Sequence, residues 1–232
     1  MTKKLFAEFL GTFCLVFAGT GAIVVDDLTG GIVTHPGVAL TFGLVVLAMI
    51  YSLGDISGAH LNPAVTLGFF AARRLGGGLV LPYIASQVAG ALAASFLLRA
   101  LFPGRAHLGA TLPSGSAAQS FVIEILLTAM LMLVILSVST GSKERGITAG
   151  LVVGSVIALA ALFAGPVSGA SMNPARSLGP ALATMNLSYL WLYLAAPALG
   201  AILGVACCRC LREEGCCTGS CGRGLPPEPQ ST

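Results

Sequence analysis

Charged residues are scarce in this sequence. Asp, Glu, Lys and Arg together make up 9% of the 232 residues, whereas an ordinary soluble domain contains about 25%. Hydrophobic residues make up 56% of the chain, and its mean hydropathy is +0.91. So little charge excludes an ordinary soluble domain and indicates a protein that lies in the lipid bilayer.

Residues that build catalytic centres are also few and scattered. The three histidines, His35, His60 and His107, lie in different segments, with no cluster of nucleophile, base or metal ligands around them. The formal net charge of +3 needs no nucleic-acid partner to explain it. The sequence therefore predicts that the protein is not an enzyme, has no cofactor and does not bind nucleic acid.

Cysteine is concentrated at the end of the chain, where six of the seven follow residue 206. We expect residues 211–232 to form a disordered cytoplasmic tail, because Gly, Pro and Glu are frequent there, and its thiols to be reduced. A second interpretation is that the tail captures a soft metal ion or a metalloid, since thiolates prefer such ligands. The candidate thiolates are those of Cys207, Cys210, Cys216 and Cys217.

Long apolar segments fill most of the remaining sequence. A membrane-spanning helix needs about 20 mostly apolar residues, and six such segments lie between polar breaks. If they alternate in direction, nine Lys and Arg residues fall on one side of the membrane and two on the other. Because cytoplasmic loops carry the excess, we expect a multi-pass plasma or inner membrane protein with both termini in the cytoplasm. The segments are residues 5–25, 36–53, 80–101, 117–140, 146–165 and 188–211.

The chain also contains an internal repeat. Residues 57–64 read Ser-Gly-Ala-His-Leu-Asn-Pro-Ala, and residues 168–175 read Ser-Gly-Ala-Ser-Met-Asn-Pro-Ala. Each half carries three apolar segments and one copy of this motif, and an odd number of crossings turns the second half upside down. We therefore predict two inverted repeats, residues 1–110 and 111–210.

Each motif predicts the start of a short helix inside the membrane. Asn is a favoured cap and Pro suits the first helical position, and the helices expected at residues 64–70 and 175–183 are too short to span. Their loops must be buried in protein or line water. We expect the two helix N-termini to meet near the membrane midplane, where Asn62 and Asn173 direct their amide groups into a pore and the helix dipoles repel cations.

Arg176 is the one basic residue outside the loops. A guanidinium within the membrane is costly and indicates a functional site, here a group with several hydrogen-bond donors that also repels cations. Glu8 and Glu124 are further charges within apolar segments, and such carboxylates need partners. Proton coupling is the alternative role for them.

The two motifs with their flanks, residues 57–66 and 168–177, resemble the two signature loops of the major intrinsic protein family, the aquaporins and aquaglyceroporins. The similarity extends from about residue 6 to residue 206. It implies an all-α membrane protein with six transmembrane helices and two re-entrant half-helices, in an inverted three-plus-three arrangement. It also implies a homotetramer with one pore in each subunit, pore motifs at Asn62-Pro63-Ala64 and Asn173-Pro174-Ala175, and loops that are supported by Glu8 and Glu124. His60 lies two residues before Asn62, and we expect it to support the loop, with gating as the alternative.

The resemblance further implies a second constriction, formed by four residues that we call the constriction residues: Phe42, Ala161, Ala170 and Arg176. Many water-selective members carry histidine at the position of Ala161, so alanine predicts a wider opening with an apolar flank. Residues 165–180 resemble the nodulin-26-like branch and its bacterial relatives, which pass glycerol, urea and neutral metalloid hydroxides such as arsenite. Ser177, in contrast, stands where glycerol facilitators carry aspartate.

The sequence thus favours a passive channel for water and small uncharged solutes that excludes protons and ions. A strict water channel is the first alternative. A secondary transporter also uses inverted repeats and broken helices, but only Glu8 and Glu124 could couple it to an ion. A purely structural role would leave Arg176 without a purpose.

Overall fold

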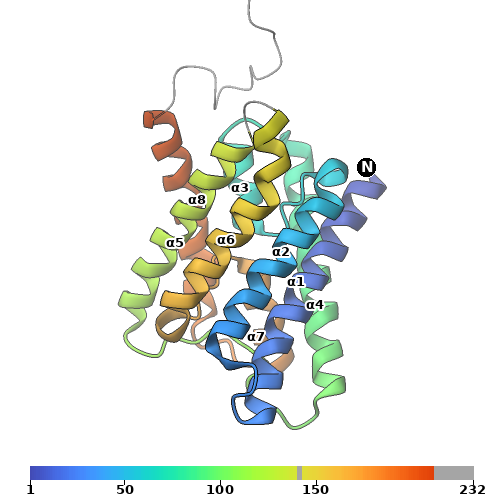
Figure 1. The fold of residues 1–232 in the computed structure, drawn as a ribbon, viewed down its shortest axis with the longest axis vertical. Helices are drawn as coiled ribbons and strands as arrows, with labels where there is room; N and C mark the ends of the chain where they lie inside the picture. The colour runs from blue at the N-terminus through green and yellow to red at the C-terminus, as the bar shows by residue number, and fades with distance from the viewer. Residues whose placement is uncertain (140–142, 212–232) are drawn as a thin grey trace, which may run out of the picture.

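The computed structural model describes residues 1–139 and 143–211, and the regular secondary structure in these ranges is all helical. Six helices are long and apolar enough to cross a membrane, in close agreement with the six predicted segments, and they form one bundle (Figure 1). Two short helices follow the Asn-Pro-Ala motifs. The helices are α1 (Thr2–Thr29), α2 (Thr34–Ser57), α3 (Pro63–Ala71), α4 (Gly77–Leu101), α5 (Ala117–Val138), α6 (Lys143–Ser168), α7 (Pro174–Thr184) and α8 (Leu190–Leu211).

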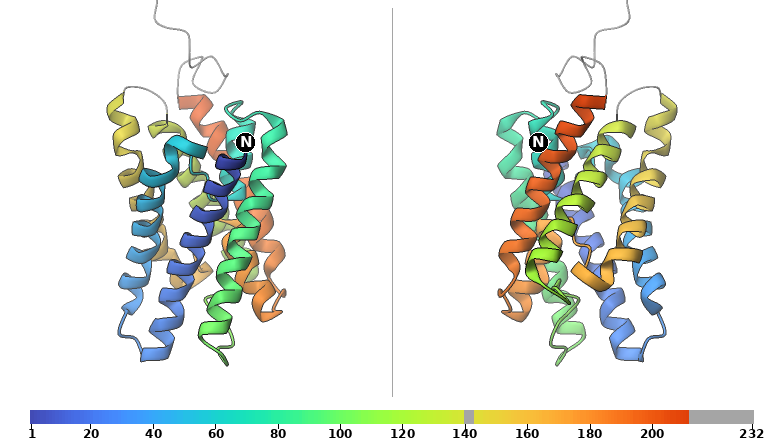
Figure 2. Two further views of the ribbon diagram at one scale, coloured as in Figure 1. Left: turned by 90° about the vertical axis from the view of Figure 1, so that its right-hand side faces the viewer. Right: turned by 90° about the vertical axis from the view of Figure 1, so that its left-hand side faces the viewer.

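The long helices pair in the same way in both halves of the chain. Helix α1 packs on α4, α5 packs on α8, and α2 packs on α6 across the middle. The N-terminus and the end of α8 lie at the same end of the bundle (Figures 1 and 2), which is the arrangement that six crossings require.

The short helices α3 and α7 lie in opposite halves of the bundle and contact each other (Figure 1). Helix α3 packs on α8, and α7 packs on α4. Each short helix therefore packs against the last long helix of the other half of the chain.

Glycine allows the long helices to approach closely. A Cβ atom on Gly90 would lie 2.2 Å from the carbonyl oxygen of Phe9, and one on Gly200 would lie 2.4 Å from that of Ile125. Such distances exclude any side chain at the α1–α4 and α5–α8 crossings, which have the small-residue packing that is common between membrane helices.

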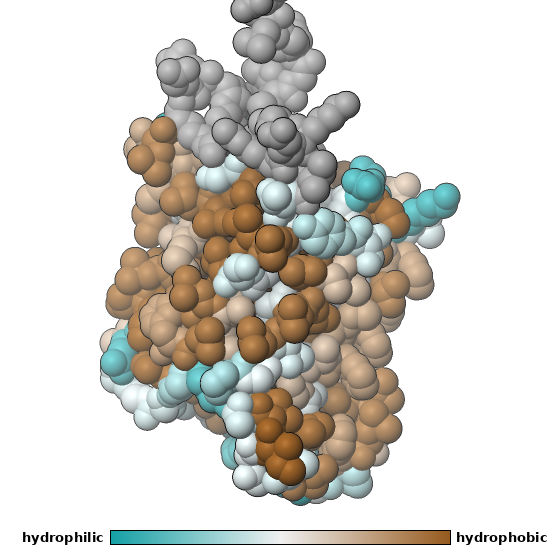
Figure 3. Space-filling view, viewed as in Figure 1, coloured by the Kyte–Doolittle hydropathy of each residue, from teal (hydrophilic) through white to brown (hydrophobic). Residues whose placement is uncertain are grey.

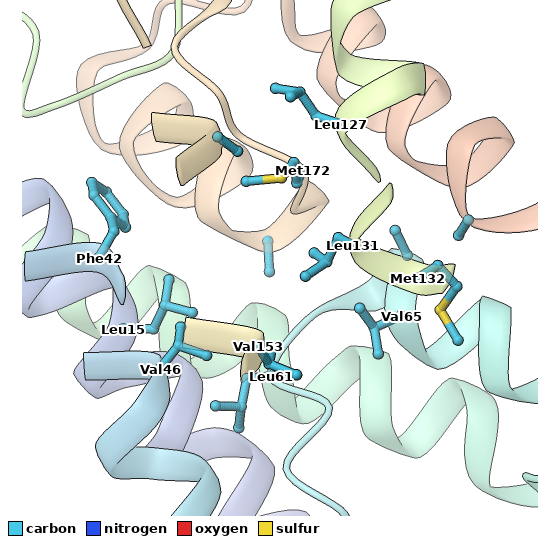
Figure 4. Packing of buried hydrophobic residues seen from close by; sticks show 14 of the residues in the cluster. Leu15, Phe42, Val46, Leu61, Val65, Leu127, Leu131, Met132, Val153 and Met172 are labelled. Atoms are coloured by element: carbon cyan, nitrogen blue, oxygen red, sulfur yellow. The ribbon is translucent and has the colours of Figure 1, made fainter. Parts of the chain in front are cut away.

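The outer surface of the bundle is apolar over most of the face in Figure 3, with polar residues mainly toward its two ends. Exposed large side chains such as Leu44, Leu81, Phe163 and Trp191 suit contact with lipid tails. Inside, buried apolar side chains from long helices surround the two loops, with Leu61 of one loop and Met172 of the other among them (Figure 4).

Candidate pore between the two Asn-Pro-Ala motifs

Both short helices begin as the sequence predicts. Asn62 has an extended backbone, and its Oδ1 accepts a hydrogen bond of 2.8 Å from the backbone N–H of Ala64. Asn173 is also extended, and its Oδ1 accepts from the N–H groups of Ala175 at 3.0 Å and Arg176 at 3.3 Å. A proline follows each Asn at the first helical position, where its missing N–H costs nothing.

The amide nitrogens of the two Asn residues join the two halves of the chain. Nδ2 of Asn62 donates to the carbonyl oxygen of Met172 at 2.7 Å, and Nδ2 of Asn173 donates to that of Leu61 at 2.9 Å. The expectation that the whole amide group faces the pore was therefore too simple. Each amide has two N–H groups, and these bonds to the opposite loop use one of them.

The two loops share an unusual backbone conformation at matching positions. Leu61 and Met172 have φ values of 53° and 52°, and two residues earlier Ala59 and Ala170 have φ values of 45° and 41°. Non-glycine residues adopt this left-handed region rarely, at a cost of about 1–2 kcal/mol each. Other interactions must therefore stabilise these two loops.

The buried carboxylate of Glu8 holds the first loop. Its Oε1 accepts from the hydroxyl of Ser57 at 2.6 Å and from the N–H of His60 at 2.9 Å. Its Oε2 accepts from the N–H of Leu61 at 2.8 Å and from Nε2 of Gln87 at 2.7 Å. Four donors occupy this carboxylate, which leaves it poorly placed to exchange protons with a pore.

Glu124 has the corresponding contacts in the second half. Its Oε1 accepts from the hydroxyl of Ser168 at 2.9 Å and from the N–H of Ser171 at 2.8 Å, and its Oε2 accepts from the N–H of Met172 at 2.8 Å. The hydroxyl of Tyr193 donates to the carbonyl of Ser168 at 2.7 Å. Both strained loops are thus bonded to a carboxylate from the first long helix of their own half.

A cavity of about 110 Å³ runs past both motifs. Its lining includes Asn62, Asn173 and all four constriction residues, so the structure brings together side chains from α2, α6, α7 and the loop before α7. Three of the constriction residues are apolar. The fourth, Arg176, is 3% exposed.

Two contacts fix the guanidinium of Arg176. Its central carbon lies 5.1 Å from the ring centroid of Phe42, a cation–π distance. Its Nη1 donates to the carbonyl oxygen of Gly109 at 2.8 Å. Among the side chains that the structure describes, none forms an ion pair with Arg176, so its positive charge acts on the cavity together with the positive ends of α3 and α7.

The segment between α4 and α5 also supports this region. The hydroxyl of Thr111 donates to that of Ser177 at 2.8 Å, and Ser177 lies 2.6 Å from the hydroxyl of Ser171. Sequence reasoning missed Gly109 and Thr111. Nothing in the sequence around Gly109 and Thr111 predicts that they contact Arg176 and Ser177, which are more than 60 residues away.

His60 lies on the other side of the Asn pair and lines the same cavity. Its ring stacks on that of Phe69 at 4.4 Å between centroids and meets Tyr83 edge-on at 5.2 Å. Its Nδ1 lies 3.1 Å from the hydroxyl of Thr66. The side chain is held on several sides, in keeping with the expected support of the loop.

Half of the cysteine cluster falls outside the described residues. Cys207 and Cys210 lie in the last turns of α8, whereas Cys216 and Cys217 lie beyond residue 211. Within the described ranges no three His, Cys, Asp or Glu side chains gather as metal ligands would.

Comparison with known proteins gives the family. The model of the family described as "Major intrinsic protein" matches residues 1–207. Aquaporin NIP1-3 and aquaporin NIP1-4 of Oryza sativa subsp. japonica are 50% and 53% identical to the chain over 203 residues; the matches cover 87% of this chain and 71% and 74% of those proteins. The crystal structure of the aquaglyceroporin from Plasmodium falciparum matches with a TM-score of 0.81 and 28% identity, covering 88% of this chain and 94% of that one. The chain therefore belongs to the major intrinsic protein family, the membrane channels for water and small uncharged solutes.

Proposed function

We propose that this protein is a passive channel that conducts water, glycerol, urea and neutral metalloid hydroxides and excludes protons and ions. The observation that carries the proposal is the single cavity that joins the four constriction residues to Asn62 and Asn173. The names of the relatives, NIP aquaporins and an aquaglyceroporin, support water and glycerol among these solutes.

At the constriction a solute exchanges part of its hydration for protein contacts. Arg176 offers N–H donors to hydroxyl or carbonyl oxygens, while Phe42, Ala161 and Ala170 provide an apolar flank. A small polyol has one hydrogen-bonding face and one carbon face, which suits such a ring. The methyl group of Ala161 leaves space that an imidazole at this position would fill.

Beyond the constriction the solute passes the two Asn residues in single file. A water oxygen that accepts from the remaining N–H of Asn62 and of Asn173 has both hydrogens directed away from the Asn pair. This orientation interrupts the chain of hydrogen bonds along which a proton would hop. The Arg176 charge and the two helix dipoles add an electrostatic barrier to cations.

Carrier function is a poorer explanation of the same geometry. A coupled transporter needs a site whose protonation or ion occupancy changes during the cycle. Glu8 and Glu124 are the candidates, and both spend their oxygens on loop donors. A strict water channel is the remaining alternative, and the transport assay below separates it from the proposed function.

The wider organisation that we propose follows from the sequence and from the family. The two inverted repeats comprise residues 1–110 and 111–210, and both termini face the cytoplasm from a plasma or inner membrane. This orientation puts the four constriction residues in the extracellular half of the pore. The exposed apolar flanks of the bundle suit assembly into a homotetramer with a pore in each subunit.

Stopped-flow light scattering of proteoliposomes tests the proposal. We expect fast osmotic shrinkage in an impermeant osmolyte, followed by re-swelling when glycerol, urea or arsenite is the osmolyte. Ala161→His should abolish the re-swelling and keep the water flux, because the imidazole narrows the opening. Shrinkage without re-swelling in the wild type would establish the strict water channel, and saturable flux driven by an ion gradient would favour the carrier.

A further inference from the structure

Helix α6 contains a proline close to its end, and the helix continues past it. Pro166 lies two residues before the last helical position of Lys143–Ser168. A proline has no N–H, so the carbonyl oxygen of Leu162, four residues earlier, loses its partner in the helix. An unpaired carbonyl in this position calls for another donor.

His35 of α2 supplies that donor. Its Nε2 lies 2.8 Å from the carbonyl oxygen of Leu162. A carbonyl oxygen can only accept a hydrogen bond, so Nε2 must carry the hydrogen. The bond links the first turn of α2 to the last turns of α6, at the end of the bundle away from the N-terminus.

Residues next to His35 and Leu162 hold the imidazole in position for this hydrogen bond. A Cβ atom on Gly165 would lie 3.0 Å from Cε1 of His35, so the imidazole lies directly against a glycine. On the other side, the N–H of Thr34 donates to Oδ1 of Asp26 at 2.8 Å, and Thr34 has a φ of 64°. A β-branched residue in this region is strained, and the bond to Asp26 holds this conformation at the first residue of α2.

The bond lies beside the constriction. Phe42 follows His35 by seven residues, about two helical turns, so both lie on one face of α2. Ala161 directly precedes Leu162 on α6. Further from this end of the bundle the two helices touch again, since a Cβ atom on Gly43 would lie 2.6 Å from the carbonyl oxygen of Gly154.

We propose that His35 is a positioning residue for solute selectivity, which replaces the N–H missing at Pro166 and thereby fixes the distance between Phe42 and Ala161. The His35 bond and the Gly43 contact tie α2 to α6 on both sides of the constriction. Because Ala161 has only a methyl group, the backbone position of α6 sets the width of the opening at this wall. This inference deepens the proposed function and rests on it.

A double-mutant cycle tests the inference. His35→Ala should relax size discrimination and raise the ratio of erythritol to glycerol permeability by roughly three- to tenfold, the range expected for loss of one hydrogen bond. Pro166→Ala restores an N–H for the Leu162 carbonyl, so in that background His35→Ala should change the ratio less than about twofold. His35→Gln, which keeps a donor, should retain most of the wild-type ratio.

Equal effects of His35→Ala in both backgrounds, or no effect in the wild type, would overturn the inference. A wild type that passes water and no glycerol would instead refute the proposed solute range, and the cycle is then read on water permeability. A readout independent of transport is solid-state NMR of protein labelled with ¹⁵N-histidine in liposomes, where only three histidines contribute. We expect a hydrogen-bonded Nε2–H tautomer for His35, and an Nδ1–H tautomer would refute the proposal.

Discussion

Gly19 of α1 lies directly behind the ring of Phe42. A Cβ atom on Gly19 would lie 2.2 Å from Cε1 of this ring and 2.5 Å from Cδ1 and Cζ. Ordinary contact needs about 3.5 Å, so Gly19→Ala must push the ring away from α1 by roughly 1 Å. Phe42 lines the cavity and lies against Arg176, so the displaced ring narrows the opening.

The size of the effect follows from the cost of overpacking. An extra methyl group in a packed interior costs about 1–3 kcal/mol. If glycerol must push the ring back as it passes, the same energy adds to its barrier and lowers its permeability by roughly 5- to 150-fold. Water is smaller and should lose much less permeability. The measurement is glycerol re-swelling and osmotic shrinkage of the same proteoliposomes.

Gly21→Ala is the matched control for this prediction. Gly21 lies two residues further along α1, and a Cβ atom there would meet Cδ2 of Leu98 at 3.4 Å, an ordinary contact. Both changes gain the same helix propensity, about 1 kcal/mol, and only one meets Phe42. A glycerol-to-water ratio that stays constant in Gly19→Ala, or that falls equally in both variants, would refute the role of Gly19.

Two further predictions concern buried charges. Glu124→Gln turns an acceptor oxygen into an NH₂ group that faces loop donors such as the N–H of Met172; one unpaired donor costs about 1–3 kcal/mol, so the thermal midpoint in detergent should fall, and an unchanged midpoint would contradict the loop-support role. Arg176→Ala should raise proton permeability on the order of a hundredfold, because a unit charge beside the cavity is lost. A pH-sensitive dye inside the vesicles measures this flux, Arg176→Lys should keep the low value, and an unchanged flux in the alanine variant would assign proton exclusion to the half-helices alone.

The local parts of the pore could be predicted from the sequence, because capping is a local interaction. Asn followed by Pro fixed the start of each short helix to within one residue, and apolar length gave the six crossings. The bonds from Asn62 to Met172 and from Arg176 to Gly109 could not be predicted, since they join segments more than 60 residues apart and produce no periodic pattern in the sequence. The bond from His35 to Leu162 is of the same kind, and the predicted segment, residues 146–165, ended before the proline that leaves this carbonyl without a helical partner.

Four long-range bonds at the centre explain why the arrangement of the two Asn residues needs both halves of the chain. The N–H of Leu61 donates to Glu8 of its own half, and its carbonyl accepts from Asn173 of the other half. Met172 repeats this with Glu124 and Asn62. Each of these two strained residues is therefore hydrogen-bonded through both its N–H and its carbonyl, and each Asn donates one amide N–H to this arrangement. The second N–H of each amide cannot be reoriented without breaking a bond to the opposite loop, so under the proposed function a passing water would meet two donors whose directions are already fixed.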